Sequence, residues 1–201
     1  MARRPAPGTR ERILRVASGL FQRHGVRAVG LQQVVAETGL GKSLLYREFA
    51  SKDELVAAWL AESDAAWWTK VEGELRRHDG DPARQMLAIV ELTIEIAQGP
   101  DFHGCIFYNT ASEFRDPAHP GRREARGHLE RMRERLRSLA RDAGAGEPDE
   151  LADALMLLMG GIYASSSVLS PGGPASAALA TARSLIDAHC PAPAGEPRLP
   201  G

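Results

Sequence analysis

The sequence predicts an all-α protein of about nine helices, three short ones in an N-terminal head and six in a larger body. Apolar residues recur at intervals of three and four through most of the chain, which is the period of a helix that buries one face. No segment shows the convincing alternation of apolar and polar residues that marks a half-buried strand. Glycine and proline separate the periodic segments, for example at Gly99-Pro100, so the helix ends are also readable.

The head begins with a helix that we expect to start near Thr9 and to close at His24-Gly25. A second, short helix follows from Leu31 and ends at Gly39, because glycine readily adopts the left-handed conformation that terminates a helix. A third helix runs from Lys42 to Phe49. The residues predicted to face inward from the first helix are Ile13, Leu14, Ala17, Leu20 and Phe21.

Two short helices joined by a glycine-bearing turn are the arrangement of the DNA-binding helix-turn-helix, whose second helix enters the major groove. In the third predicted helix, Leu45 and Phe49 lie four residues apart on one face. This leaves Lys42, Tyr46 and Arg47 on the outside, where cations and a phenol hydroxyl can meet phosphates. The pattern therefore predicts a DNA-binding protein.

The next helix should begin after Ser51, which is a plausible N-cap with Glu54 at the matching capping-box position. The free N–H groups at such a helix start bind anions, so Lys52 and its neighbours are predicted to contact a phosphate.

These residues resemble the TetR family of bacterial regulators, over a stretch from about Thr9 to Leu55. The first helix is similar to the family's first helix, and a characteristic run follows it. The positions of this chain that match that run are Gly39, Leu40, Lys42, Leu45, Tyr46, Phe49 and Lys52.

The resemblance implies a helix-turn-helix DNA-binding domain in residues 1–51 and a ligand-binding and dimerisation domain in residues 52–190. It also implies a homodimer on a pseudo-palindromic operator, most often a repressor released by a small hydrophobic effector, although an activator would show the same sequence features. The lack of a secretory signal and of a disulfide framework leads us to expect a cytoplasmic protein. The residues expected to contact DNA are Gly30, Gln32, Gly41, Lys42, Ser43, Leu44, Tyr46, Arg47 and Lys52.

Several positions depart from the family pattern. Gly41 and Leu44 stand where serine and threonine are usual, Val29-Gly30 replaces a threonine-serine cap, and Glu48 replaces a phosphate-friendly residue. An acid near the groove is repelled by phosphates unless it accepts from a cytosine amino group. These departures favour a second interpretation, an all-helical ligand-binding protein or enzyme with a degenerate DNA-binding head. A third is a dimerising interaction protein without a small ligand.

The distribution of charge supports the DNA-binding interpretation, although the net charge of the chain is only −1. Residues 1–50 hold nine Lys and Arg against three Asp and Glu, whereas the rest holds 16 against 23. A basic end on an acidic body is the pattern expected of a protein that brings one end to DNA.

The body continues with a long helix from Lys52 to His78 and another from Pro82 to about Gln98. A short helix is predicted from His103 to Phe114, followed by a loop through Gly121. Three more helices are expected over 122–143, 148–169 and 175–189. The tail 191–201, with four prolines in eleven residues, is expected to be disordered.

Residues 122–141 contain eight arginines, which raises the question of a second nucleic-acid surface. Acids interleave with them, and Glu130, Glu134, Arg137 and Arg141 have the spacing of ion pairs along one helix. We therefore expect a solvated, salt-bridged helix face.

The last two helices carry apolar stripes and small residues, which can either complete a monomer core or form a dimer interface. In the resembled family these helices pack against their symmetry mates, which implies a homodimer here. The residues predicted for the interface are Leu155, Ile162, Leu179, Ala182, Leu185 and Ile186.

A ligand pocket is predicted where aromatic and sulfur-containing residues cluster, although any one of them can be plain core. The predicted lining is Trp67, Trp68, Phe102, Cys105, Phe107, Tyr108, Asn109, Met156, Met159 and Tyr163. Cys105 is more simply a buried cysteine than a redox sensor.

Other classes of protein lack support in the sequence. No catalytic motif, cofactor motif or metal-ligand spacing is present, and two cysteines give no disulfide framework. No apolar run has the length of a membrane helix, and no secretory signal is seen. We therefore expect no enzyme activity, no cofactor, no metal and no membrane partner.

Overall fold

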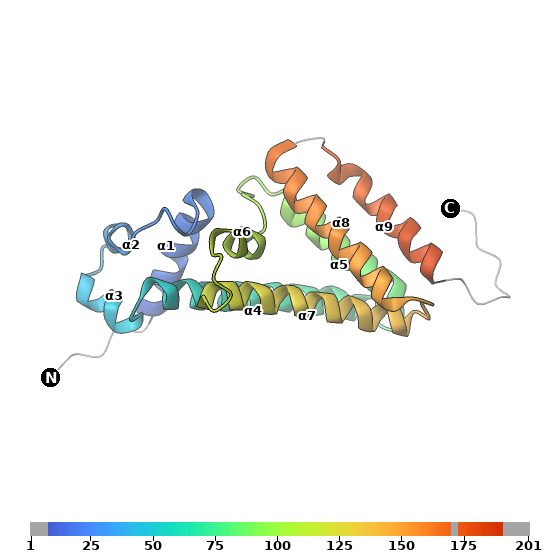
Figure 1. Cartoon of the computed structure of the whole chain (residues 1–201), viewed down its shortest axis with the longest axis horizontal. Coiled ribbons are helices and arrows are strands. Elements are labelled where there is room, and N and C mark those ends of the chain that lie inside the picture. Colours follow the sequence, from blue (N-terminus) through green and yellow to red (C-terminus); the bar gives the residue numbers. More distant parts are fainter. Residues whose placement is uncertain (1–7, 170–172, 191–201) are drawn as a thin grey trace. The chain divides into compact units, whose positions relative to one another are not determined.

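The computed structural model describes residues 8–169 and 173–190. This part of the chain forms nine helices and no strand, which confirms the predicted all-α class (Figure 1). It divides into two compact units. The first contains the chain up to Trp67 together with Cys105–Leu129, and the second contains Trp68–Gly104 together with the chain from Glu130 onward.

The first unit contains α1 (Thr9–His24), α2 (Leu31–Thr38) and α3 (Lys42–Glu48), which are followed directly by the start of α4 (Lys52–Arg77). It also contains α6 (Ile106–Glu113) and the start of α7 (Pro120–Asp142). Figure 1 shows α1, α2 and α3 grouped around the N-terminal end of α4.

A single apolar cluster holds the first unit together. The residues predicted to face inward from α1 are all buried, and they pack with Leu45 of α3, with its C-cap Phe49 and with Trp59 of α4. Phe107 of α6 and Ala125 of α7 belong to the same cluster. Burying a large apolar side chain stabilises a fold by about 1.5–3 kcal/mol, so this shared core fixes α3 on its neighbours.

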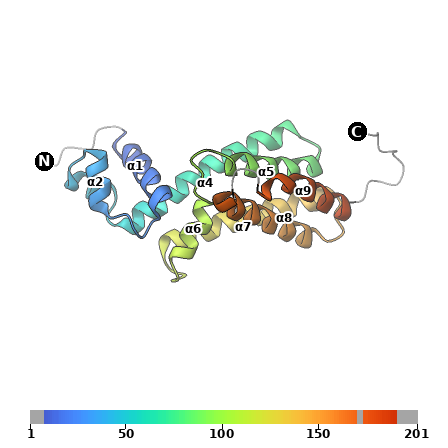
Figure 2. The ribbon, with the colours of Figure 1, turned by 90° about the horizontal axis from the view of Figure 1, so that it is seen from above.

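The second unit is built on α5 (Pro82–Ala97), α8 (Pro148–Leu169) and α9 (Ala175–His189), which pack against one another (Figure 2). Asp81 caps α5 by accepting from the N–H of Arg84 at 2.9 Å, and Pro82 takes the first helical position, where a missing N–H is harmless. The later parts of α4 and α7 complete this unit.

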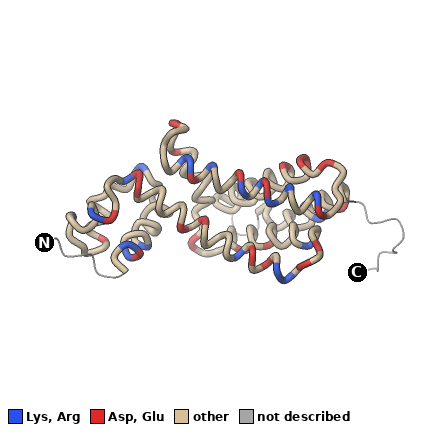
Figure 3. Tube along the Cα trace, turned by 90° about the horizontal axis from the view of Figure 1, so that it is seen from below, with Lys and Arg blue, Asp and Glu red and all other residues tan. Residues whose placement is uncertain are grey.

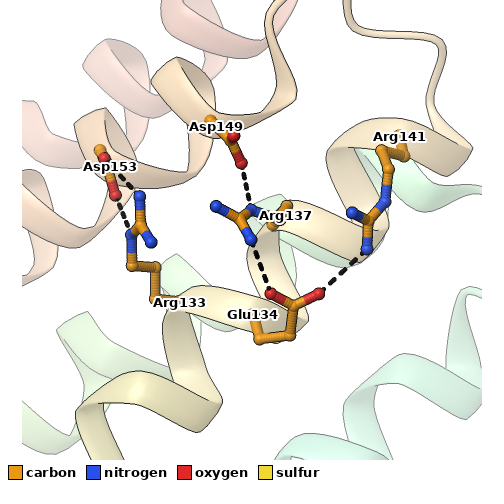
Figure 4. Close-up of polar contacts among 6 residues, drawn as sticks. All are labelled: Arg133, Glu134, Arg137, Arg141, Asp149 and Asp153. Carbon is orange, nitrogen blue, oxygen red and sulfur yellow. Dashed lines mark hydrogen bonds and ion pairs between the residues drawn. The ribbon is translucent and has the colours of Figure 1, made fainter.

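Ion pairs join α7 to its neighbours in the second unit. Arg133 forms a bidentate ion pair with Asp153 of α8, and Arg137 pairs with Asp149, also of α8 (Figure 4). Within α7, Glu134 accepts from Arg137 at 3.1 Å and from Arg141 at 3.0 Å, which confirms the predicted salt-bridged face. Figure 3 shows that basic and acidic residues are interspersed along the helices.

Two helix starts differ from the prediction. The helix predicted from His103 begins at Ile106, because Gly104 is left-handed with φ 95° and Cys105 is an extended N-cap. The helix predicted from Arg122 begins at Pro120, since proline suits the first turn of a helix. The tail predicted to be disordered lies outside the described residues.

Among the described helices, α8 alone has the length and apolar composition of a membrane span. This is weak evidence for a membrane, because the core helices of water-soluble proteins have the same properties. In the second unit α8 packs against α5 and α9 and carries Leu151 and Leu155 in the core.

Candidate functional site

Glycines set the geometry of α2 and α3. Gly39 is left-handed with φ 63° and ends α2, as predicted. Gly30 and Gly41 are the N-caps of α2 and α3 in extended conformations, and neither helix has a side-chain cap. The first N–H groups of both helices therefore lack side-chain acceptors among the described residues, and such groups bind phosphate well.

The outer face of α3 is polar and cationic. Leu45 is fully buried, whereas Tyr46 is 44% exposed and Lys42 and Arg47 are exposed on the same helix. The Lys42 ammonium lies 5.8 Å from the centre of the Tyr46 ring. The surface can therefore present two cations and a phenol hydroxyl to the phosphate backbone.

The remaining residues predicted to contact DNA lie at or near the starts of α2, α3 and α4. Gly30 and Gln32 are exposed at the start of α2, and Gly41 and Ser43 are exposed at the start of α3. Leu44 is half-buried, which is consistent with packing as well as with contact to a thymine methyl.

The start of α4 has the predicted capping box in a slightly shifted form. Ser51 accepts from the N–H of Glu54 at 3.1 Å, and the Glu54 carboxylate reaches back to the N–H of Ala50 at 2.8 Å. The Lys52 ammonium donates to the Arg27 carbonyl at 3.2 Å. Burial lowers the pKa of Lys52, and the nearby carboxylates of Glu113 and Asp53 oppose this effect. The phosphate contact predicted for Lys52 stays a prediction.

Two polar residues in this region were missed by the sequence prediction. Arg10 donates to the carbonyl of Glu48 at 3.1 Å and lies 4.3 Å from the centre of the Phe49 ring, which ties α1 to the end of α3. Glu113 of α6 accepts from two backbone N–H groups that follow α1. The partners of both residues lie far away in the sequence, so no local pattern pointed to these contacts.

The residues predicted to line a ligand pocket divide equally between the two units. Five belong to the first unit and five to the second. In the second, the rings of Phe102 and Tyr163 stack with centres 5.7 Å apart. Met159 is buried, and Trp68 and Met156 are half-buried. The first-unit residues are Trp67, Cys105, Phe107, Tyr108 and Asn109.

A buried polar and aromatic cluster surrounds His128 in the first unit. The rings of His128 and Phe107 stack with centres 3.6 Å apart. The ring of Trp67 packs edge-on against that of His128, with centres 6.3 Å apart. His128 Nδ1 lies 2.6 Å from a carboxylate oxygen of Asp64. Sequence reasoning missed His128, because a lone histidine on an arginine-rich helix has no distinguishing spacing.

Two buried polar atoms near this cluster have no hydrogen-bond partner in the described part of the chain: Trp67 Nε1 and Thr110 Oγ1. Thr110 follows Phe107 by one turn of α6, so the two share a face. Buried polar atoms usually find a partner, and exceptions indicate a missing water or ligand.

Cys105 and Tyr108 lie at the start of α6. Burial raises the pKa of the Cys105 thiol, although the N–H groups of Tyr108 and Phe107 act in the opposite direction. A raised pKa keeps the thiol protonated, whereas redox sensing needs a thiolate. Tyr108 and Asn109 are exposed.

A separate surface groove of about 290 Å³ lies between α1 and α4 in the first unit. None of the residues predicted to bind a ligand lines it. Its walls include Arg15, Ser18, Trp59 and Glu62, and the Trp59 indole donates to Ser18 at 3.0 Å. Among the described residues, no three His, Cys, Asp or Glu side chains gather as a metal site would require.

Comparison with known proteins identifies the family. Residues 13–59 match the family model of bacterial regulatory proteins of the tetR family, and residues 82–182 match that of the tetracyclin repressor-like C-terminal domain. The chain belongs to the TetR family. It is therefore a DNA-binding transcriptional regulator, and regulators of this family bind operator DNA and act as dimers.

Solved structures from two Streptomyces species support this TetR assignment. A TetR transcriptional regulator from Streptomyces avermitilis MA-4680 is 33% identical, with a TM-score of 0.78 over 90% of this chain and 97% of that one. A TetR-family regulator from Streptomyces coelicolor is 26% identical, with a TM-score of 0.85 over 90% and 95%.

A curated relative resembles only the DNA-binding end of this TetR-family chain. The uncharacterized HTH-type transcriptional regulator YxaF of Bacillus subtilis (strain 168) is 50% identical over 48 residues. The match covers 23% of this chain and about a quarter of the length of the relative.

Most of the residues predicted for the TetR-type dimer interface are core residues of the protomer. Leu155, Ile162, Ala182 and Ile186 are at most 3% exposed in the single chain, so they pack inside the protomer, and their place in a dimer interface stays a prediction. The other two predicted residues, Leu179 and Leu185, are half-buried.

Proposed function

We propose that this TetR-family regulator is a cytoplasmic homodimer that represses transcription from a pseudo-palindromic operator and is released by a small hydrophobic effector. The observation that carries the proposal is the outer face of α3, where Lys42, Tyr46 and Arg47 stand over the buried Leu45 and Phe49. A rigid helix with this surface is suited to the major groove, with cations and a hydroxyl placed for phosphates.

The exposed apolar side chains of α8 support dimerisation. Leu157 and Val168 are 78% and 79% exposed, and Gly161 and Ala164 lie between them on the same helix face. Large apolar side chains are rarely left this open over three helical turns unless a partner covers them. A two-fold interface on this face would place two copies of α3 on one DNA site, which favours a palindromic operator.

The His128 cluster supports an effector site. Trp67 Nε1 and Thr110 Oγ1 are a donor and a hydroxyl without hydrogen-bond partners among the described residues, and the rings of Trp67 and Phe107 both contact His128. An apolar ligand with one or two polar atoms fits this chemistry, since most ligand sites combine apolar walls with a few polar groups. The effector would act by binding the DNA-competent and DNA-incompetent states with different affinities, because only differential affinity shifts a population.

The first test is fluorescence anisotropy of the purified protein on tiled duplexes from the DNA flanking its own gene, repeated across a salt series. We expect saturable binding to one imperfect palindrome by an even number of chains, with a steep salt dependence. Complete absence of binding at low salt on every duplex would refute the proposal. It would favour the alternative of an all-helical ligand-binding protein or enzyme with a degenerate DNA-binding head.

Matched lysine variants test the placement of α3. Lys42→Ala should weaken operator binding and reduce the slope of log affinity against log salt by about one, because one phosphate contact is lost. Lys70→Ala, at an exposed lysine of α4, is the control and should leave both quantities unchanged. Equal salt slopes for the two variants would show that Lys42 makes no phosphate contact.

Tyr46→Phe separates the hydroxyl from the ring. It should weaken binding severalfold and leave the salt slope unchanged, because the lost phosphate contact is uncharged. Unchanged affinity would show that Tyr46 only packs.

A further inference from the structure

The end of α6 is bound to the turn that joins α1 to α2. One carboxylate oxygen of Glu113 accepts from the N–H of Val26 at 2.9 Å, and the other accepts from the N–H of Arg27 at 2.6 Å. All three residues belong to the first compact unit. An ionised carboxylate that accepts two main-chain N–H groups makes hydrogen bonds roughly twice as strong as neutral ones.

The local backbone leaves room for this contact. Gly25 ends α1 with φ 81°, a conformation that side chains disfavour. A Cβ at Gly25 would lie 3.3 Å from the Glu113 carboxylate, so glycine also allows the close approach.

The turn positions the helix-turn-helix. Val26 and Val29 are at most 2% exposed and anchor it in the core, and Gly30 directly after it is the N-cap of α2. The Lys52 ammonium holds the Arg27 carbonyl at 3.2 Å from the start of α4. A shift of the turn would therefore be passed to the start of α2.

The C-terminal end of α6 is itself firmly held. Arg122 of α7 donates to the carbonyls of Phe114 and Arg115 at 2.5 and 3.1 Å. The ring of Phe114 stacks on that of His119 with centres 3.6 Å apart. Glu113 is thus presented by a fixed helix end rather than by a loose loop.

We infer that Glu113 is a positioning residue for DNA binding, through which α6 holds the α1–α2 turn and with it the helix-turn-helix. Thr110 lies one turn before Glu113 on α6. If the proposed effector site is correct, a ligand that displaces Thr110 would move this anchor. The role of Glu113 in the unliganded protein rests only on the DNA-binding function.

The sharpest test is Glu113→Gln, which keeps the shape of the side chain. Glutamine has one acceptor oxygen, and its NH2 group would face a backbone N–H, so one hydrogen bond is lost and two donors are opposed. A residue that only fills space would tolerate this change.

We expect hydrogen exchange at the Val26 and Arg27 amides to accelerate by roughly tenfold or more in Glu113→Gln, and operator affinity to fall by a similar factor. The salt slope should stay unchanged, because the phosphate contacts themselves remain. Glu95→Gln, at an exposed glutamate of α5, is the matched control and should behave as wild type.

The wild-type protein provides a test that does not depend on any variant folding. The amides of Val26 and Arg27 should exchange more slowly than that of Ala28, whose N–H has no partner among the described residues. Equal exchange of the three amides would overturn the inference, as would unchanged operator affinity in a folded Glu113→Gln. If wild type itself binds no duplex, the proposed function fails, while the exchange experiment still judges the contact.

Discussion

Thr110 and Thr93 are both buried threonines in helices, and they differ in whether the side-chain hydroxyl has a hydrogen-bond partner. Thr93 donates to the Ile89 carbonyl at 2.9 Å, whereas Thr110 Oγ1 has no partner in the described part of the chain. Replacing a partnered hydroxyl removes a hydrogen bond, and replacing an unpartnered one removes only a desolvation cost.

Thr110→Val should therefore leave the unliganded protein as stable as wild type or more stable, and should weaken effector binding. Thr93→Val is the matched control and should lower the free energy of unfolding by about 1 kcal/mol, which is about 2–4 °C in Tm for a chain of this size. Thermal unfolding of both variants decides the point. A clear loss of stability in Thr110→Val would mean that its hydroxyl is hydrogen-bonded to an ordered water.

At the residue scale, the sequence was informative where function depends on local pattern. The spacing of Leu45 and Phe49 correctly placed Lys42, Tyr46 and Arg47 on the outer face of α3. The contacts of Arg10 and Glu113 were not predicted, because their hydrogen-bond partners lie 38 and 86 or more residues away in the chain. Nothing in a helical period encodes such pairings.

The N-terminus of α3 is the element where a departure from the family pattern can be tested for its effect on stability. Gly41 has φ −68°, and a side chain there would meet nothing within 4 Å. Gly41→Ser should raise the stability by about 0.5–1 kcal/mol, through a side-chain cap and a less flexible unfolded chain.

Gly39→Ser is the opposite case, because Gly39 has φ 63° and a side chain in that conformation costs about 1–2 kcal/mol. Urea unfolding should shift the midpoint upward for Gly41→Ser and downward for Gly39→Ser. Two downward shifts would show that the open N-terminus of α3 is needed for the fold.

The junction of α7 with α8 should respond to pH. The hydrogen bond from Arg133 holds the pKa of Asp153 below its usual range, against the effect of burial. Because the folded pKa is lower than the unfolded one, the ionised carboxylate stabilises the fold above the unfolded pKa. That contribution is lost as the pH falls through the folded pKa.

Asp153→Asn should therefore be less stable than wild type at pH 7, and the difference should narrow as the pH falls through the lowered folded-state pKa of Asp153. The pair is solvent-exposed, so added salt should also shrink the difference. A gap that stays the same size on acidification would assign the effect to packing. Urea unfolding at several pH values provides the measurement.

At the element scale, the helix boundaries followed from proline, glycine and capping residues, and α4, α5, α8 and α9 lie within one residue of their predicted bounds. The start of α6 was misplaced, because the sequence alone did not show that the backbone at Gly104 is left-handed. The α8 partners of Arg133 and Arg137 were also missed. The sequence showed acids within α7 but not which face of α8 would lie opposite them.

At the scale of the whole molecule, the charge asymmetry and the helix-turn-helix indicated a DNA-binding end correctly. The packing adds α6 and the start of α7 to the unit that contains this end. Such long-range packing depends on which apolar faces meet, and a single sequence specifies only that the faces exist. The predicted boundary at residue 51 separates a DNA-binding part from a ligand-binding and dimerisation part, and this division of roles stays a prediction.

Dimerisation is the whole-molecule property that the exposed face of α8 lets us test. Leu157→Glu places a charge on a side chain that is 78% exposed in the single chain, so the protomer should stay folded. In a dimer the same charge would be buried without a partner, which costs several kcal/mol at each of two symmetric sites. We therefore expect monomers in sedimentation velocity and loss of operator binding, because one head alone contacts only half a site.

Two further variants separate this explanation from its rivals. Ala61→Glu adds the same charge to an exposed position on α4 and should leave both assembly and operator binding intact, which excludes a general effect of negative charge. Leu155→Ala, in the core of α8, should instead lower the stability of the protomer by about 2–5 kcal/mol, as expected of a core leucine. A Leu157→Glu protein that remains a dimer would place the interface on another face and would also weaken the case for a palindromic operator read by two copies of α3.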